Sequence, residues 1–192
     1  MITIDQVKEL RDKTGISVMQ CKKALEETDG DAEKAIIILN KQSKAIAEKK
    51  AGRSLASGVV QAYVHAGGGV GSMVELLCET DFVAKNEEFK TLAYDIAMHI
   101  TATNPAFLKK EDVLAEDRAK VKEVLQKEVA DKPEEMRENI LEGKLNSYFK
   151  ENILLEQEFV KNPKQTIANL IESATQKFGE KIEVGNFVRF SI

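Results

Sequence analysis

Apolar residues recur at helical spacing in three short stretches at the start of the chain, between residues 3 and 40. Val7 and Leu10 form the stripe of the first stretch, which Gly15 is placed to end in a left-handed turn. The second stretch runs from Val18 to Glu27, and the third carries its stripe from Ala32 to Leu39. A candidate helix cap precedes each stretch: Thr3 with Gln6, Ser17 with Gln20, and Asp31.

These helices predict a compact N-terminal module over residues 1–40 that is similar to a ubiquitin-associated domain. About forty residues is marginal for independent stability, so the helices must be small and tightly packed. Residues 41–54 lose the apolar periodicity and are rich in Lys, Ala and Ser, which predicts a linker that can continue as helix for a few turns. Lys49, Lys50 and Arg53 in this linker form either a phosphate-contacting patch or a solvated charge run, and short runs are usually solvated.

The pattern changes to that of β-strands after residue 55. Strand-forming residues are dense from Val59 to Val64, and a second apolar run covers Met73 to Cys78. Between them lies the glycine cluster Gly67–Gly71, which no Gly-Lys-Ser/Thr follows and which leads into a strand. It therefore predicts a hairpin connection between strands at 57–66 and 72–79, and not a nucleotide-binding loop. Alternating apolar residues predict a last strand at 182–191.

Helical spacing returns near Asn86 and continues in a stripe from Phe89 to Ile100. His99 lies off this stripe, so we expect its side chain to be partly exposed. After a break at residues 104–105, the sequence predicts helices at 111–130 and 134–149, an extended link at 153–161, and a helix opened by Asn162-Pro163 and closed by Gly179. Residues 55–192 are thus predicted to be an α+β core domain, with helices on one face of an antiparallel or mixed sheet.

The net charge of the chain favours a protein partner over a nucleic acid. The chain of 192 residues has a formal net charge of −4 and a pI near 5.4. A broad nucleic-acid surface would need Lys and Arg clustered on one face, so we expect a protein partner and no direct nucleic-acid contact. No stretch approaches the roughly 20 consecutive apolar residues of a membrane helix, and the N-terminus lacks a signal-peptide pattern. A cytoplasmic protein without a membrane contact is expected.

Side chains suited to covalent or metal chemistry are few. Cys21, Cys78, His65 and His99 lie on separate predicted segments without the spacing of metal ligands. We therefore expect reduced thiols and neither a metal nor a cofactor. No Ser/His/Asp or Cys/His set has a plausible order, and the paired acids fall on exposed helix faces. The sequence predicts a binding protein without catalytic residues, not an enzyme.

The junction between the apolar run ending at Cys78 and the helix starting near Asn86 reads Glu-Thr-Asp-Phe-Val-Ala-Lys. One interpretation is that Thr80 or Asp81 caps the following turn while Phe82 fills the core beneath it. The other is that an acidic group and a projecting aromatic side chain form a wedge that pushes into a partner. The residues alone leave both interpretations open.

Several motifs along the chain carry a family resemblance. They are Thr80–Lys85 with Glu75 and Cys78-Glu79 before it, Leu10-Arg11 with Thr14-Gly15, Cys21–Leu25, Leu154–Lys161, and Phe187–Phe190. Together they resemble elongation factor Ts over essentially the whole length. Two positions depart from the family pattern: Leu77 stands where Asn is usual, and Glu158 where Pro is usual. Longer members carry the sheet-and-helix unit twice, so this chain resembles the short form with one copy.

The resemblance implies a translation elongation factor that promotes guanine-nucleotide exchange on elongation factor Tu, binding it in both the GDP-bound and the nucleotide-free state. Thr80, Asp81, Phe82 and Val83 would then displace the elements of the partner that hold Mg²⁺, without Asp81 binding the metal itself. Arg11, Val18 and Met19 would contact the partner's G domain. From the residues alone, Val18 and Met19 could equally belong to the small core of the module.

Rival functions rest on single features. The three-helix module could belong to an adaptor for ubiquitin-like proteins, or to a helix-turn-helix that binds nucleic acid, although the acidic charge speaks against the latter. For the assembly state, an edge strand at residues 182–192 favours a homodimer joined through the core domains, with Phe187 and Phe190 near the contact. The alternative is a monomer whose own helices cover that edge.

Overall fold

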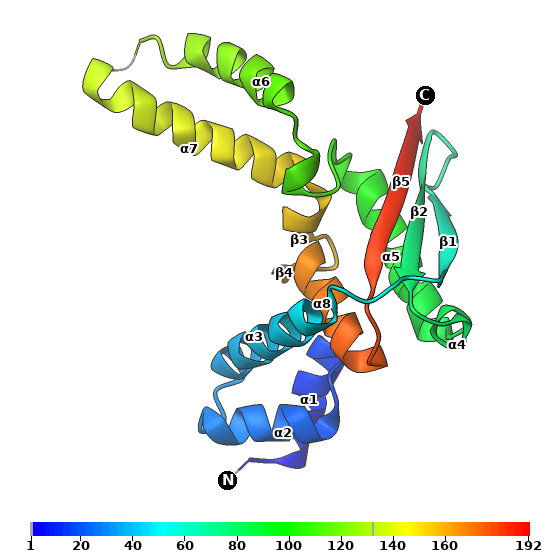
Figure 1. Ribbon diagram of the computed structural model, residues 1–192. Helices are drawn as coiled ribbons and strands as arrows, with labels where there is room; N and C mark the ends of the chain where they lie inside the picture. Colours follow the sequence, from blue (N-terminus) through cyan, green and yellow to red (C-terminus); the bar gives the residue numbers. More distant parts are fainter. Residues whose placement is uncertain (1, 132) are drawn as a thin grey trace.

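The computed structural model describes residues 2–131 and 133–192, and it shows a central sheet-and-helix body from which two helical arms extend (Figure 1). Helix α5 (Glu87–Thr103) packs on a three-stranded sheet, and α8 (Ile167–Phe178) completes the same hydrophobic core. One arm is the N-terminal module and the other is a long helical hairpin. The predicted α+β class is confirmed. Within the described residues, no helix combines the length and apolar character needed to cross a bilayer.

The N-terminal module contains α1 (Ile4–Thr14), α2 (Val18–Glu27) and the first half of α3 (Ala32–Lys50). The predicted caps are present: Thr3 and Gln6 form a capping box, Ser17 and Asp31 cap the next two helices, and Gly15 ends α1 with φ 69°. Eight buried side chains fill its core: Val7, Leu10, Ile16, Cys21, Ala24, Leu25, Ala35 and Leu39.

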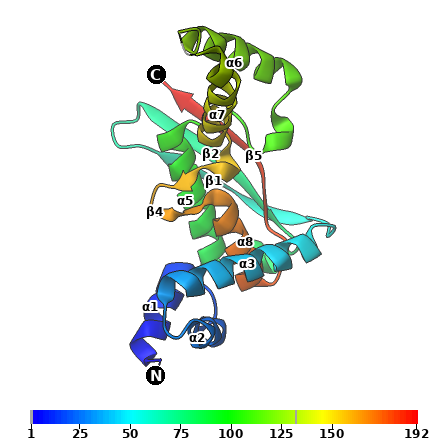
Figure 2. The same ribbon diagram turned by 90° about the vertical axis from the view of Figure 1, so that its left-hand side faces the viewer.

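Helix α3 does not stop at residue 40 but runs on to Lys50 and lies along α8 (Figure 2). Ser43 is fully buried at this contact, with its Oγ 2.5 Å from Oε1 of Gln176 on α8. At the end of α3, Lys50 Nζ donates a 2.7 Å hydrogen bond to the carbonyl oxygen of Gly179. A single helix therefore connects the module to the central body.

The sheet has the strand order β1-β2-β5 and is antiparallel throughout, with β1 at Ser57–Val64, β2 at Val70–Cys78 and β5 at Glu183–Ser191. The connection between β1 and β2 is the predicted hairpin, because Gly67 and Gly68 take φ values of 94° and 74° and the Gly68 amide donates to His65. β5 forms one edge, as predicted from the sequence.

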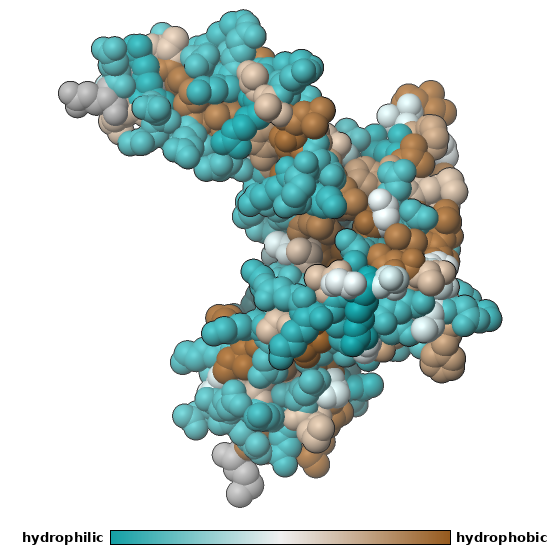
Figure 3. Space-filling model, in the orientation of Figure 1, coloured by the Kyte–Doolittle hydropathy of each residue, from teal (hydrophilic) through white to brown (hydrophobic). Residues whose placement is uncertain are grey.

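The two faces of the sheet differ. Val74, Leu76 and Cys78 of β2 are buried on the face that α5 covers. The other face has no covering helix among the described residues, and brown, hydrophobic residues are visible over the sheet in Figure 3. Its exposed apolar side chains come from all three strands: Val60, Val64, Met73, Val188 and Phe190.

The second arm consists of α6 (Ala115–Glu128) and α7 (Glu134–Asn152), which pack on each other through a small core of their own. The predicted start of the first helix at residue 111 was wrong. Residues 110–112 form the short 3₁₀ turn η1 (Lys110–Asp112), in which the Lys109 amide donates to the Asp112 carboxylate at 3.1 Å. This local side-chain bond holds a turn and delays the helix.

Residues 153–166 also differ from the prediction. The expected extended link contains a 3₁₀ turn, η2 (Leu154–Glu156), and the short strand β3 (Glu158–Phe159). Asn162-Pro163 does not open a helix, because residues 162–166 form β4 (Asn162–Thr166) and pair with β3. The helix begins at Ile167 instead, where Thr166 and Asn169 make a capping box that satisfies the first amides of α8.

The expectation of a partly exposed His99 was wrong, because this side chain is fully buried. Its Nδ1 accepts a 3.3 Å hydrogen bond from the Val160 amide, so the proton lies on Nε2, which donates to Gln157 Oε1 at 2.9 Å. Burial lowers the pKa of His99, and the hydrogen bond to Gln157 opposes this in part. The neutral ring thus ties α5 to the β3 segment.

This arrangement predicts a loss of stability in mild acid. Unfolding returns the pKa of His99 toward its ordinary value of 6.5, so below that pH the unfolded state binds more protons than the folded state. We expect His99→Gln to lower the free energy of unfolding by about 1–3 kcal/mol at pH 7.5, since its partners lose a hydrogen bond. The variant should also show a smaller further loss at pH 5.5 than the unmodified chain, measured by urea denaturation.

His65→Gln is the matched control, because His65 is exposed at the hairpin and the chain contains only two histidines. That variant should keep the full acid dependence of the unmodified chain. If the free energy of unfolding falls equally with pH in His99→Gln and in the unmodified chain, buried His99 is not the source of the acid sensitivity.

Candidate functional site

The corner between the sheet and α5 is a single helical turn, α4 (Asp81–Ala84). Thr80 is its N-cap, and the hydroxyl oxygen of Thr80 accepts a 3.4 Å hydrogen bond from the Val83 amide. Asn86 then caps α5 by accepting from the Glu88 amide at 2.8 Å. The expected cap at Thr80 is therefore present, and the chain reverses between two capped helices.

Phe82 does not fill the core, since 82% of this side chain is exposed. The following residues, Val83 and Ala84, are buried in the main hydrophobic core instead. The turn is fixed to the body by its inner side, and Cys78 Sγ adds a hydrogen bond to the Thr80 carbonyl at 3.2 Å. The interpretation of Phe82 as a core residue is wrong, and a bare aromatic ring stands at the tip of the corner.

Asp81 is exposed beside Phe82 and pairs with Lys85, whose Nζ lies 2.6 Å from Oδ2. This hydrogen bond and the charge of Lys85 lower the pKa of Asp81, so the carboxylate is ionised at neutral pH. Exposed ion pairs contribute little free energy, so Asp81 can leave Lys85 for another partner at small cost. The corner therefore presents one aromatic ring and one available negative charge.

A carboxylate from far along the chain supports this corner. The side chain of Glu180 accepts hydrogen bonds from the Glu79 amide at 3.1 Å, the Thr80 amide at 3.0 Å and the Thr80 hydroxyl at 2.6 Å. Sequence reasoning missed Glu180, because its partners lie about a hundred positions away and no local pattern marks it. The one signal nearby was Gly179, which ends α8 and places the next residue in a tight turn.

Glu79 makes the reciprocal contact. Its carboxylate accepts from the Lys181 amide at 2.6 Å and from Arg53 at 3.2 Å. The hydrogen bond from the Lys181 amide is the largest cause of a lowered pKa for Glu79, and Arg53 adds to it. Arg53 is thus neither a solvated linker charge nor a free phosphate contact, but joins the linker to the corner.

The second set of predicted residues lies on the N-terminal module. Val18 and Met19 are 55% and 78% exposed, whereas the neighbouring Ile16 is buried in the core of the module. Arg11 is exposed as well. A groove of about 420 Å³ runs beside them, and its lining includes Ile2, Ile4, Val7, Lys8, Arg11, Val18 and Lys22. The alternative that Val18 and Met19 serve the small core is wrong.

The structure does not gather these two sets into one site. Arg11, Val18 and Met19 lie on α1 and α2, while Thr80–Val83 forms the N-cap and first residues of α4, at the end of the sheet opposite to the C-terminus (Figure 1). Between them lies α3, whose Lys50 bonds to Gly179. The linker residue Arg53 then pairs with Glu79, whose amide donates to Glu180. The candidate site therefore consists of two separate surfaces on one frame.

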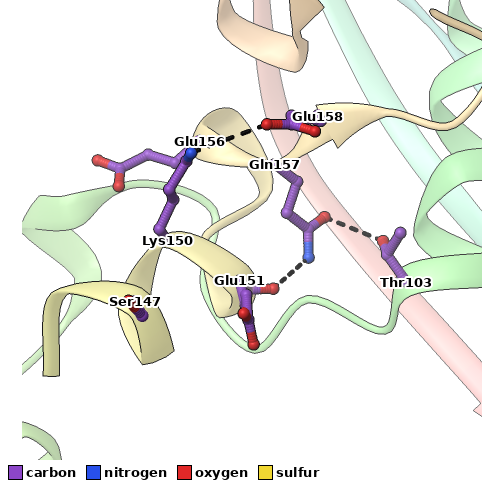
Figure 4. Close-up of a pocket in the computed structure, with 7 residues that line it drawn as sticks. All are labelled: Thr103, Ser147, Lys150, Glu151, Glu156, Gln157 and Glu158. Carbon is purple, nitrogen blue, oxygen red and sulfur yellow. Dashed lines mark hydrogen bonds and ion pairs between the residues drawn. The ribbon is translucent and has the colours of Figure 1, made fainter. Parts of the chain in front are cut away.

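A polar cleft of about 530 Å³ lies elsewhere, between the end of α7 and η2 (Figure 4). Among its charged side chains, Lys150 pairs with Glu158 at 3.8 Å and Glu156 pairs with Lys110 at 2.8 Å. Gln157 spans its wall, donating to the Glu151 carbonyl while its Oε1 lies 2.9 Å from the Thr103 hydroxyl. In the part of the chain that the structure describes, no three His, Cys, Asp or Glu side chains are grouped to hold a metal ion. The cleft offers no convergent catalytic set.

These features define a class of α+β protein whose candidate binding residues are exposed on a short turn and on a helical module. They do not line a cleft. Residues 20–192 match the family described as Elongation factor TS. The chain therefore belongs to the elongation factor Ts family, which confirms the resemblance seen in its motifs.

Individual relatives align over the whole chain. It is 48% identical to elongation factor Ts of Heliobacterium modesticaldum, covering all of this chain and 90% of the relative. The identity is 50% with that of Carboxydothermus hydrogenoformans, covering 89% of the relative, and 48% with that of Thermosipho melanesiensis, covering 99%. Such similar lengths fit the predicted short form. Of the two departures, Leu77 lies in β2 and Glu158 in β3, so both are outside α4.

The burial pattern of α4 predicts a small effect on stability at one residue and a large effect at the next. Phe82→Ala should change the free energy of unfolding by less than about 0.5 kcal/mol, because an exposed side chain loses few contacts. Val83→Ala should cost roughly 1–3 kcal/mol, since it removes buried methyl groups and leaves a cavity. Urea denaturation of both variants checks this. A larger cost for Phe82→Ala than for Val83→Ala would contradict the described orientation of the turn.

Proposed function

We propose that this protein is the guanine-nucleotide exchange factor for elongation factor Tu and acts without making or breaking a covalent bond. The observation that supports it most is Phe82, a bare aromatic ring on a turn anchored by its neighbours, within the motif that resembles the family signature. An exposed ring of this kind gains its burial only from a partner. The family of the chain supplies the identity of that partner. Its place of action would be the cytoplasm.

The chemistry of the partner explains why a wedge would suffice. GTPases of this type hold GDP through backbone cradling of the phosphates and through Mg²⁺. In the proposed mechanism Phe82 inserts between elements that frame the nucleotide site, and Asp81 helps to displace those that hold the metal. Thr80 and Val83 fix the turn from which both project. Asp81 would act on protein groups and not as a metal ligand.

Docking would use the N-terminal module, with Val18 and Met19 as apolar contacts and Arg11 as a charged one. Because coupling between two ligands is reciprocal, the factor must weaken GDP binding by the same ratio as GDP weakens binding of the factor. The protein must therefore bind both the GDP-bound and the nucleotide-free partner. A strong preference for one form alone would stop turnover.

The proposal predicts separable defects in a stopped-flow assay of labelled GDP release from elongation factor Tu. Phe82→Ala should lower the maximal release rate at saturating factor, because the wedge acts after docking. Met19→Asp should raise the concentration needed for half-maximal release, because a charge must be desolvated at an apolar contact. We expect each effect to be at least about tenfold, equivalent to roughly 1.4 kcal/mol.

Val124→Ala is a suitable control for both variants, since Val124 is 59% exposed on α6, away from the two surfaces. Its release kinetics should match those of the unmodified chain. If the unmodified protein does not accelerate GDP release at all, the proposed function is wrong.

For the assembly state we propose a homodimer joined through the sheets. The exposure of Phe190, 67% on the uncovered face, supports a contact there, whereas Phe187 packs partly buried against the main core. Phe190, Val188 and Met73 would meet their counterparts, because a two-fold pair of such faces covers both apolar surfaces at once. Both corners would stay free for partners.

Sedimentation velocity over a wide concentration range tests the dimer. The chain mass is 21.4 kDa, so the proposed dimer should sediment with about twice that mass. Phe190→Asp should shift the equilibrium toward the monomer, since a buried charge would have to be desolvated at the contact. A single species at the chain mass throughout would rule the dimer out.

A further inference from the structure

The Thr80–Val83 corner depends on a residue outside its own motif. We propose that Glu180 is a positioning residue, which holds the corner in the one shape that presents Phe82 outward. This inference rests on the proposed function for its consequence in exchange, but its structural part concerns the free protein alone.

Helix α4 is too short to be stable by itself. It contains four residues, and its regular backbone bonds are those of Ala84 to Thr80 and Lys85 to Asp81, at 3.2 and 3.1 Å. Forming a first helical turn is unfavourable because several dihedral angles are fixed for very few hydrogen bonds. Phe82 cannot anchor the turn, because its ring is exposed. Contacts from outside the turn must therefore hold it.

Glu180 supplies such contacts at the first residue of the turn. Its Oε2 accepts from the amides of Glu79 and Thr80, and its Oε1 accepts from the Thr80 hydroxyl. The hydroxyl proton is then committed to Glu180, which leaves the hydroxyl oxygen facing the Val83 amide as the helix cap. One carboxylate thus fixes both the backbone before the turn and the side chain that starts it.

The placement of Glu180 is itself determined by the fold. Gly179 takes φ 72° at the end of α8, a conformation that favours glycine, and its carbonyl accepts the hydrogen bond from Lys50. On the other side, the Lys181 amide donates to Glu79. Glu79 and Glu180 therefore each accept from the backbone beside the other, and the two chain segments are locked together in both directions.

The expected role follows from this geometry. Without Glu180, Val83 and Ala84 would still pack in the core, but the start of the turn would fray and the direction of Phe82 would vary. The module surface at Val18 and Met19 does not contact Glu180, so docking should be spared. Loss of Glu180 should consequently lower the maximal rate of GDP release more than the apparent affinity.

The first test uses the free protein and amide hydrogen exchange by NMR. In Glu180→Ala, the Thr80 and Val83 amides should exchange at least about tenfold faster, while amides in α5 keep their protection, because a charge-assisted hydrogen bond is lost at the corner only. Glu180→Gln, which keeps one carbonyl oxygen, should give a smaller increase. Glu183→Ala is the matched control, since Glu183 pairs with Lys181 at 2.8 Å and should leave both amides unchanged.

The second test measures GDP release with the same variants. We expect at least about a tenfold lower maximal rate for Glu180→Ala, partial recovery for Glu180→Gln, and a half-saturating concentration within about twofold of the unmodified value. Adding Thr80→Val to Glu180→Ala should have little further effect, because the two residues act as a unit.

Unchanged amide exchange in Glu180→Ala would overturn the proposal whatever the release assay shows. So would faster amide exchange combined with an unaltered maximal rate. If Glu180→Ala loses protection throughout the sheet, Glu180→Gln decides the matter by the same criteria. If the unmodified protein releases no GDP, the proposed function fails, yet the amide-exchange result still judges whether Glu180 holds the corner.

Discussion

One helix that is buried in the module core at one end and packs on α8 of the central body at the other is the constraint on which the arrangement of this molecule depends. Ala35 and Leu39 of α3 are buried in the module, and Ser43, one turn further on the same face, is buried against Gln176 of α8. Since the helix is continuous between these points, the module cannot turn about the body without breaking one of the two contacts. A patch on α2 and a corner on α4 thus hold a fixed spatial relation, although no residue of one touches the other.

Local signals in the sequence were sufficient for the helices of the module and for the β1–β2 hairpin. The caps at Thr3, Ser17 and Asp31 and the stop at Gly15 depend on bonds within a few residues, so the helices of the module could be read directly. The same holds for the Gly67–Gly68 hairpin. Two helix starts were still missed although local bonds set them, at the Lys109–Asp112 turn and at the Thr166 capping box. The burial of His99 was missed because distant partners decide it. His99 lies off the apolar stripe of its own helix, but Gln157 and Val160 supply the polar contacts that allow its burial.

The candidate site, too, could be predicted from the sequence only in part. The residues of the corner could be found from their motif, but periodicity could not say whether Phe82 faces inward, because a four-residue turn is too short to define a face. Burial of Val83 and Ala84 answers that question. Glu180 and Arg53 could not have been found from the sequence, since what matters is their position against Glu79 and Thr80 across the fold. A supporting carboxylate has no sequence pattern of its own.

The support at the start of the corner, before the buried Val83 and Ala84, is polar, and this has a physical reason. An apolar anchor at the start of α4 would offer Phe82 a surface on which to collapse, and the ring would then be lost to a partner. The Glu180 carboxylate accepts three hydrogen bonds and so holds this part of the chain while presenting nothing that an aromatic ring would prefer to water. Burying such a ring in a partner is worth about 1.5–3 kcal/mol, too little for tight binding by itself. In the proposed function, the second surface on the module, carried at a fixed distance by α3, would add its own contacts within the same encounter and so raise the effective concentration of the corner at its target.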